Sequence, residues 1–198
     1  MAAPRQIARL KVTLADIEPV VVRRLEVPLK IRLDRLHLVL QAAMPWTDSH
    51  LYEFMAGGMG WGVPDQEGFH DGPLPASKAT LQKVIEETGA KTIRYIYDWG
   101  DHWDHEIRIE RIEDAQAGRL YPALIMAAGR CPPEDVGSSS GYGEFLEAIA
   151  DSNHPEHAAM LRWHGGPFDP DDPDIEVITA GLDRLARRWA PRPRKAKP

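Results

Sequence analysis

Apolar and polar residues alternate near the start of the chain with the two-residue period of a β-strand. In residues 8–14, Arg9, Lys11 and Thr13 separate apolar neighbours, which predicts a strand with one buried face. β-Branched or alternating segments predict further strands at residues 19–27, 50–55, 91–98, 105–112 and 123–128. Turn residues at 16–19 and 98–104 join two pairs of these strands into hairpins.

A helical spacing follows the first predicted hairpin. Leu33, Leu36 and Leu40 recur at intervals of three and four residues, and Pro45 ends the helix because it cannot continue the hydrogen-bond ladder. We expect these leucines to be buried against one face of the sheet. That face should include Leu10, Val12, Ile107 and Ile109.

Helices dominate the last third of the chain. Before that part of the chain, a short helix is expected from Thr80, which caps it, to Glu87. Later helices are predicted around residue 145, from 155 to 163, and from a cap at Asp174 to residue 189. Strands followed by helices, without βαβ alternation, predict a single α+β domain over residues 1–190 with a mixed, mostly antiparallel sheet. Residues 57–72, rich in glycine and proline, are expected to form a long surface loop.

The composition excludes several classes of protein. The chain has 198 residues, and its longest apolar run, Ala123–Ala128, is far shorter than the ~20 residues of a membrane helix. The first residues lack the apolar core of a signal peptide. The single cysteine, Cys131, excludes an internal disulfide and fits a reducing compartment. We therefore expect a cytoplasmic protein with no membrane partner.

Charge is distributed unevenly along the chain. The net charge is -6, yet Arg184–Pro198 holds seven Lys and Arg and no acid. The preceding 183 residues carry 17 bases and 30 acids, a net charge of -13. An acidic body repels a phosphate backbone, whereas a basic tail attracts one. Residues 191–198 are thus interpreted either as a disordered, solvated terminus or as a contact to DNA.

Four ordered motifs carry a resemblance to a known family. They are RLEVP (24–28), AAMPWTDSHLYEF (42–54), YDWGDHWDH (97–105) and CPPEDVG followed by GYGEF (131–145). With them the chain resembles the plasmid pRiA4b ORF-3-like family over about residues 6–190. The resemblance implies a compact α+β fold and, in some members, an association with mobile elements. It implies no established reaction, cofactor or catalytic set. Trp99 stands where this family usually has Phe, and Ser138–Ser140 replace a Gly-Pro-Trp-like turn.

The densest polar run of the sequence lies between residues 98 and 106. Carboxylates and imidazoles are common ligands of Zn²⁺, Mn²⁺ and Fe²⁺, so this hairpin tip is a candidate site for a divalent metal. Asp98, Asp101 and His105 form the first candidate set, completed by His50 or Glu134. Alternation places His105 on the face opposite Asp104. In the alternative interpretation, the carboxylates only accept backbone N–H bonds within a tight turn.

A second candidate is the CPPEDVG segment, where Pro132 and Pro133 stiffen the chain before Glu134 and Asp135. We predict that residues 98–105 and 131–137 lie next to each other. Their crowded carboxylates would then need a cation, N–H donors or raised pKa values.

Several aromatic residues lie beside glycine, proline or aspartate rather than in periodic segments. Those considered for an aromatic-lined pocket are Trp46, Trp99, Trp103 and Tyr142. The alternative is that they pack locally and hold loops in place.

These features give three hypotheses for function. The first is a non-catalytic binding module, in which loops at 44–50, 57–72, 98–104 and 131–143 form one rim that holds a small ligand, a peptide or nucleic acid. The second is a metal-dependent hydrolase or nuclease. The third is a DNA-associated accessory protein that uses its basic tail.

Overall fold

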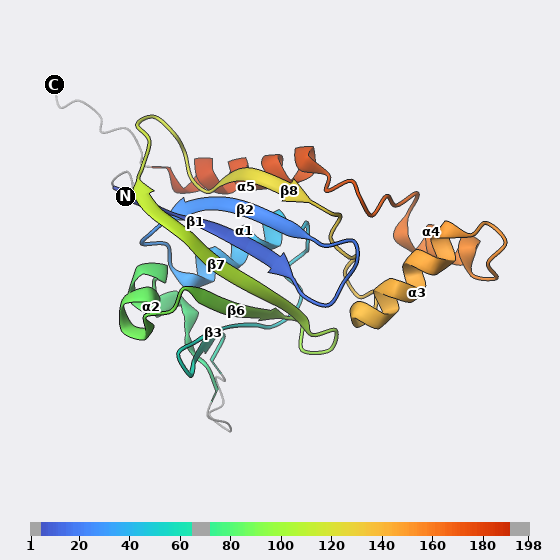
Figure 1. Cartoon of the computed structure of the whole chain (residues 1–198), viewed down its shortest axis with the longest axis horizontal. Helices are drawn as coiled ribbons and strands as arrows, with labels where there is room; N and C mark the ends of the chain where they lie inside the picture. The colour runs from blue at the N-terminus through green and yellow to red at the C-terminus, as the bar shows by residue number, and fades with distance from the viewer. Residues whose placement is uncertain (1–4, 65–71, 191–198) are drawn as a thin grey trace.

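One eight-stranded sheet forms the centre of the computed structural model, which describes residues 5–64 and 72–190 (Figure 1). The strands are β1 (Gln6–Leu14), β2 (Val22–Pro28), β3 (Tyr52–Ala56), β4 (Met59–Gly62), β5 (Leu74–Pro75), β6 (Thr92–Tyr97), β7 (Trp103–Asp114) and β8 (Ala123–Ala128). Their order in the sheet is β5-β4-β3-β6-β7-β1-β2-β8. The β4–β5 pair is parallel and the other pairs are antiparallel, which confirms the predicted mixed, mostly antiparallel sheet.

Helices cover one face of the sheet and extend beyond one end of it. They are α1 (Leu33–Ala43), α2 (Leu81–Thr88), α3 (Ser138–Ala150), α4 (His157–His164) and α5 (Ile175–Trp189), with a 3-10 turn at Ala76–Lys78. Helices α1 and α5 contact each other behind the sheet, whereas α3 and α4 stand together past the strand ends (Figure 1). The single-domain α+β fold is as predicted. No helix in the described ranges is long and apolar enough to cross a membrane.

The predicted core is confirmed. Leu33, Leu36 and Leu40 are fully buried in the same cluster as the inward-facing residues of β1 and β7. Leu10, Val12 and Ile107 are fully buried there, and Ile109 packs against the cluster while partly exposed. The leucine stripe of α1 therefore finds the apolar face that strand alternation provides.

The predicted cap of α2 at Thr80 is confirmed, and α5 begins directly after Asp174 as predicted, but without the expected cap bond. The Thr80 side chain accepts a hydrogen bond from the Lys83 backbone N–H, and Gly89, with φ of 65°, ends α2. Asp174 makes no side-chain cap bond. Its carboxylate instead lies 3.6 Å from the Arg130 guanidinium, an ion pair that holds the start of α5 to the loop after β8.

The prediction of one long loop at residues 57–72 is wrong in its first part. Strands β3 and β4 form a tight hairpin there, with Gly57 and Gly58 both at positive φ. At Gly62 a Cβ would lie 2.5 Å from the Tyr52 carbonyl oxygen, so this strand requires glycine. Residues 65–71, like the predicted tail at 191–198, lie outside the described residues.

Candidate functional site

Three loops meet where β6 ends, and one of them is the loop after β8. The Gly137 N–H donates to Asp101 Oδ2 at 3.1 Å, which joins the β6–β7 turn to residues 131–137. The Trp46 indole N–H donates to the Pro132 carbonyl at 3.0 Å and adds residues 44–50. The predicted proximity of residues 98–105 and 131–137 is therefore confirmed.

The turn at Gly57 and Gly58, which was expected to join the same rim of loops, lies elsewhere. In the β3–β6 pair, Tyr52 faces Tyr97 and Met55 faces Arg94, so the β3–β4 turn lies at the opposite end of the sheet from Asp98. Of the four expected loops, those at residues 44–50, 98–104 and 131–137 meet, the glycine turn of the fourth does not, and residues 65–71 of that loop lie outside the described residues.

Glu134 fastens these loops together. One of its carboxylate oxygens accepts from the Thr47 N–H at 2.9 Å and from the Thr47 hydroxyl. The other accepts from the Ser49 hydroxyl at 2.9 Å and from the Tyr97 hydroxyl. Partial burial favours the neutral acid, but these donors outweigh it and hold the pKa of Glu134 below its usual value. Burial, reinforced by the Glu134 carboxylate, raises the pKa of Tyr97 to about 12, so its hydroxyl keeps the proton it donates.

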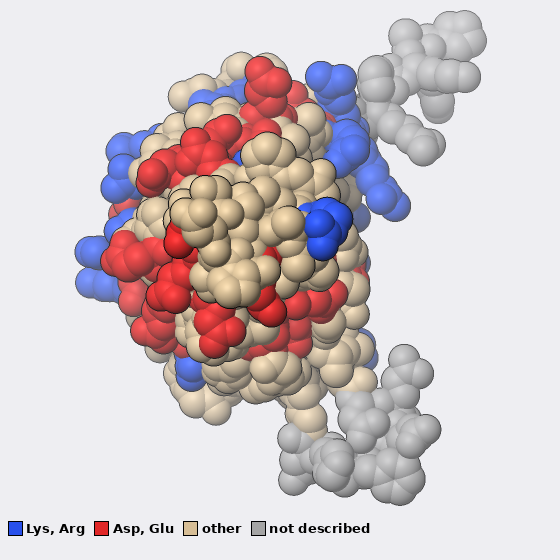
Figure 2. Space-filling view, turned by 90° about the vertical axis from the view of Figure 1, so that its right-hand side faces the viewer, with Lys and Arg blue, Asp and Glu red and all other residues tan. Residues whose placement is uncertain are grey.

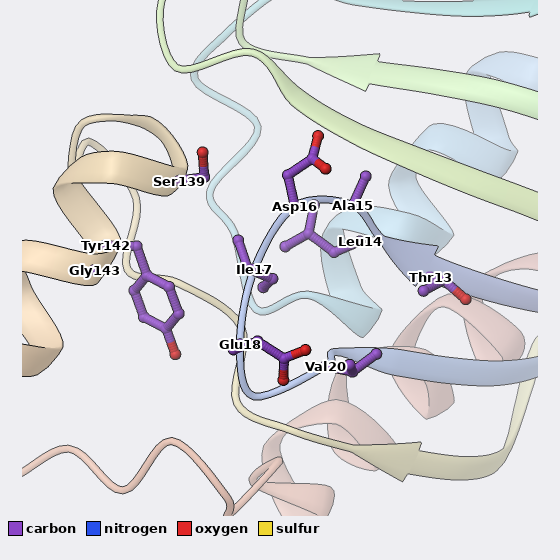
Figure 3. Close-up of a pocket in the computed structure, with 10 residues that line it drawn as sticks. All are labelled: Thr13, Leu14, Ala15, Asp16, Ile17, Glu18, Val20, Ser139, Tyr142 and Gly143. Carbon is purple, nitrogen blue, oxygen red and sulfur yellow. The ribbon is translucent and has the colours of Figure 1, made fainter.

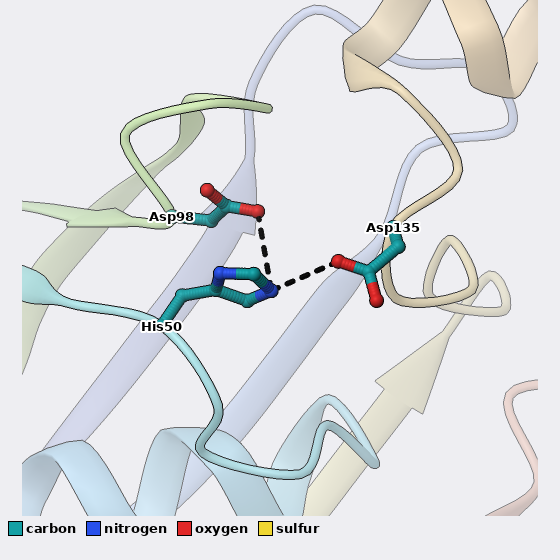
Figure 4. Close-up of side chains that lie close together, drawn as sticks. All are labelled: His50, Asp98 and Asp135. Carbon is teal, nitrogen blue, oxygen red and sulfur yellow. Dashed lines mark hydrogen bonds and ion pairs between the residues drawn. The ribbon is translucent and has the colours of Figure 1, made fainter.

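Next to this anchor, one imidazole lies between two carboxylates (Figure 4). His50 Nε2 is 2.9 Å from Asp135 Oδ1 and 3.6 Å from Asp98 Oδ2. One ligand atom from each of the three residues lies within 4.8 Å of the other two. The ring of His50 stands edge-on to Tyr97, with centroids 5.8 Å apart. We call this group the His50 triad: His50, Asp98 and Asp135.

The backbone presents both carboxylates in an uncommon conformation. Asp98 and Asp135 have φ values of 57° and 61°, in the left-handed region that few non-glycine residues occupy. Asp98 Oδ1 accepts the Gly100 N–H at 2.8 Å, and this leaves Oδ2 as the oxygen nearest His50. The tight-turn interpretation therefore applies to Oδ1 of Asp98, and the ligand interpretation stays a prediction that concerns Oδ2.

The triad has donors that suit a divalent first-row metal. Nitrogen and carboxylate oxygen bind Zn²⁺ at about 2.0–2.2 Å, so two ligand atoms on a tetrahedral ion lie about 3.3–3.6 Å apart. The His50–Asp98 separation matches this spacing, and the His50–Asp135 pair would open by a few tenths of an ångström. Asp98 is buried and Asp135 is exposed, so the group lies at the edge of the fold and reaches solvent.

Two predicted ligands have other positions or partners. His105 is fully buried, and its Nδ1 donates to the Trp103 and Tyr95 carbonyls at 3.0 and 3.2 Å. Because β7 begins at Trp103, alternation turns His105 inward, away from the triad. Burial lowers the pKa of His105 to about 4. The Asp101 carboxylate accepts a hydrogen bond from the Gly137 N–H and therefore joins the β6–β7 turn to residues 131–137.

The four aromatic residues considered for one pocket have different surroundings. Trp46 and Trp103 are buried, with ring centroids 6.0 Å apart, and Trp46 stacks on Tyr97 at 5.0 Å. Trp99 is 50% exposed. Tyr142 lies on α3, beside a shallow cavity of about 620 Å³ between that helix and the β1–β2 loop (Figure 3). The local-packing alternative therefore describes Trp46 and Trp103.

A buried polar network beneath the site was not predicted. His37 Nδ1 lies 2.8 Å from the Tyr95 hydroxyl and Nε2 lies 2.6 Å from Asp48 Oδ1, while the Asp48 N–H donates to Gln41 Oε1. Burial lowers the pKa of His37, outweighing the opposing effect of Asp48. The network links residues 44–50 to α1 and β6. Its signal in the sequence is a histidine on the buried, leucine-rich face of the first helix.

Acidic side chains dominate the end of the molecule that carries α3 and α4. Figure 2 shows Asp and Glu gathered around these helices, with few Lys or Arg among them. Such a surface attracts cations and repels nucleic-acid phosphates.

Comparisons with known proteins place the fold and the motifs in context. Residues 6–177 match the family model described as "Plasmid pRiA4b ORF-3-like protein". The "Uncharacterized protein y4hQ" of Sinorhizobium fredii is 48% identical over 190 residues, which cover 96% of this chain and 97% of that protein. The crystal structure of MM3350, a protein of unknown function from Methanosarcina mazei Go1, is 32% identical with a TM-score of 0.77. The match covers 87% of this chain and 98% of the MM3350 chain.

Proposed function

The chain belongs to the plasmid pRiA4b ORF-3-like family, as its motifs indicated, and on this premise we propose that it binds a divalent metal ion at the His50 triad. The relatives above are named as uncharacterised or of unknown function and supply no activity. The proposal therefore depends on the geometry of the three side chains.

The observation that carries it is the convergence of one imidazole and two carboxylates from three separate loops. Each loop is held independently of a metal. Asp98 is fixed by its bond to Gly100, Asp135 follows the anchored Glu134, and His50 packs against Tyr97. Held side chains lose little freedom when they bind an ion, which favours affinity. A divalent cation would also offset the repulsion between the two carboxylates.

We propose first a binding module without catalytic activity, in which the three loops and the ion they hold form one rigid rim for a small ligand, peptide or nucleic acid. Metal-dependent hydrolysis is the second candidate, favoured by the exposure of Asp135. Three protein ligands on a solvent-facing ion leave positions for water and substrate. Glu134 is a poor general base for that reaction because both of its oxygens already accept hydrogen bonds.

Metal binding is tested on the full chain after treatment with chelator. Calorimetric titration with Zn²⁺ and with Mn²⁺ should show one ion per chain for at least one metal, and the melting temperature should rise with metal concentration. His50→Asn should abolish both effects. His102→Asn is the matched control, since His102 lies in the adjacent turn but outside the triad. A melting temperature indifferent to millimolar metal and to EDTA, or equal losses in the two variants, would contradict the proposal.

Hydrolysis is tested on the same metal-loaded protein with p-nitrophenyl phosphate and bis-p-nitrophenyl phosphate. Turnover that His50→Asn removes and His102→Asn preserves would favour the enzyme. Binding of one ion without turnover of either ester would favour the module.

An association with mobile elements and a cytoplasmic location remain parts of the proposal. The first is supported by the plasmid origin in the family's name and by the basic residues after 183. The second is supported by the single cysteine, Cys131, which is buried.

A further inference from the structure

A second cavity lies far from the triad in the fold. It has a volume of about 700 Å³, within the usual range for small-molecule pockets. Its walls come from the start of β1, the segment between β2 and α1, the loop before β8 and the last turn of α5. None of the residues in the His50 triad lines it.

The inner walls of this cavity are largely apolar and include two aromatic rings. The larger apolar side chains of the lining are those of Pro28, Leu29, Ile31, Leu120, Tyr121 and Trp189. The guanidinium of Arg35 lies 5.1 Å from the Trp189 ring centroid, and that of Arg119 lies 5.7 Å from the Tyr121 ring centroid. Each aromatic wall therefore carries a cation on its face.

The charged residues around the cavity are all basic. They are Arg5, Lys30, Arg32, Arg35 and Arg119, and no Asp or Glu is among the described lining residues. Arg32 and Arg119 are paired with carboxylates outside the lining, those of Asp34 and Glu26. Arg5 and Lys30 form no ion pair within the described ranges. In a body whose first 183 residues carry a net charge of -13, this is a local concentration of positive charge.

We propose that this cavity binds a small organic anion with a flat apolar body. The apolar body would lie along the Trp189 and Tyr121 walls, and the carboxylate or phosphate would face Lys30 and Arg5. The cavity thus combines an apolar interior with charge of one sign at its edge, which excludes cations and gives neutral apolar molecules only part of the available contacts. The proposal is independent of metal binding at the triad.

The experiment uses two fluorescent probes of similar shape, the anionic 1-anilinonaphthalene-8-sulfonate and the neutral N-phenyl-1-naphthylamine. The anionic probe should bind the folded chain at one site and at least about tenfold more tightly than the neutral one, as a charge-assisted contact allows. Its affinity should fall as salt is raised. Lys30→Gln should weaken binding of the anionic probe and leave that of the neutral probe unchanged.

A matched pair of variants locates the site. Leu120→Glu adds a carboxylate to the cavity, and Ile125→Glu adds one to an exposed apolar position on β8, outside the lining. Leu120 and Ile125 are 44% and 39% exposed, so both variants should keep the melting temperature of the wild type. Leu120→Glu should lower the affinity for the anionic probe by at least about tenfold, and Ile125→Glu should lower it by less than about twofold.

Several results would overturn the proposal: equal binding of the two probes, absence of binding, or equal effects of the two glutamate variants. Competition by 2-naphthoate and by 2-naphthyl phosphate then shows whether a carboxylate or a phosphate is the preferred anion, since both compete under the proposal and failure of both contradicts it.

Discussion

Glu134 is expected to hold the candidate site in shape, and replacing it tests that role directly. Glu134→Ala removes the acceptor for four donors, from Thr47, Ser49 and Tyr97. A hydrogen bond to a charged group contributes about 1.5–3 kcal/mol when its donor is left without a partner, but water replaces part of that loss at a half-exposed site. The expected loss in free energy of unfolding is therefore about 2–4 kcal/mol in total.

Glu134→Gln separates charge from geometry. The amide oxygen can still accept both Thr47 donors, and the amide nitrogen can donate to the hydroxyls of Ser49 and Tyr97. The expected loss is about 1 kcal/mol, the charge-assisted part of the bonding. Urea unfolding at neutral pH measures both values. Glu106→Ala, at an exposed position on β7, is the control and should change stability by less than about 0.5 kcal/mol.

The pH dependence supplies a second readout. The folded-state pKa of Glu134 lies below its usual value of 4.5, so its stabilisation is present above that value and is lost as pH falls through the folded pKa. The gap between the wild type and Glu134→Gln should therefore close as the pH is lowered below about 4.5. A gap that is constant with pH, or losses below about 0.5 kcal/mol in both variants, would refute the anchoring role. Under the metal proposal, Glu134→Gln should also weaken metal binding, because Asp135 directly follows Glu134 in the chain.

Other predictions concern the core, a buried histidine and the tail. Leu36→Ala should cost about 2–5 kcal/mol in urea unfolding, since the side chain is fully buried, and a cost below about 1 kcal/mol would contradict the packed core. The pKa of His105 is about 4 in the fold against 6.5 ordinarily, so stability should fall as pH drops from 6.5 to 4. The decrease should approach about 3 kcal/mol, and His105→Gln should reduce it; an unchanged pH profile would contradict this. Deleting Pro191–Pro198 should leave the melting temperature unchanged and abolish any salt-dependent retention on DNA; a stability loss above about 1 kcal/mol would contradict the first expectation.

Most elements of the fold could be predicted because each has a strong local pattern. The leucine spacing of α1 and the alternation of β1 and β7 determine which side chains are buried, and the structure agrees except at Ile109, which is partly exposed. Strand β4 was missed because Met59–Gly62 contains two glycines in four residues and resembles a loop locally. Its strand conformation depends on pairing with β3, where Trp61 faces Phe54. Tertiary pairing thus overrides a weak propensity.

The site shows the same division between local and long-range information. That residues 98–105 and 131–137 meet followed from their carboxylates and turn residues. Asp98 and His50 were among the candidate ligands, but the full proposed set was not identified, because it depends on side-chain direction. His105 lies one position after Asp104 in β7, and a single step along a strand reverses the face. Only Asp48 and Glu53 are acidic among the nearest sequence neighbours of His50, yet the loop bonds of Glu134 bring it to 2.9 Å from Asp135. The residue with the most hydrogen bonds at the site is therefore the one that positions the triad, and the exposed Asp135 beside it is the carboxylate that, under the proposal, binds the ion.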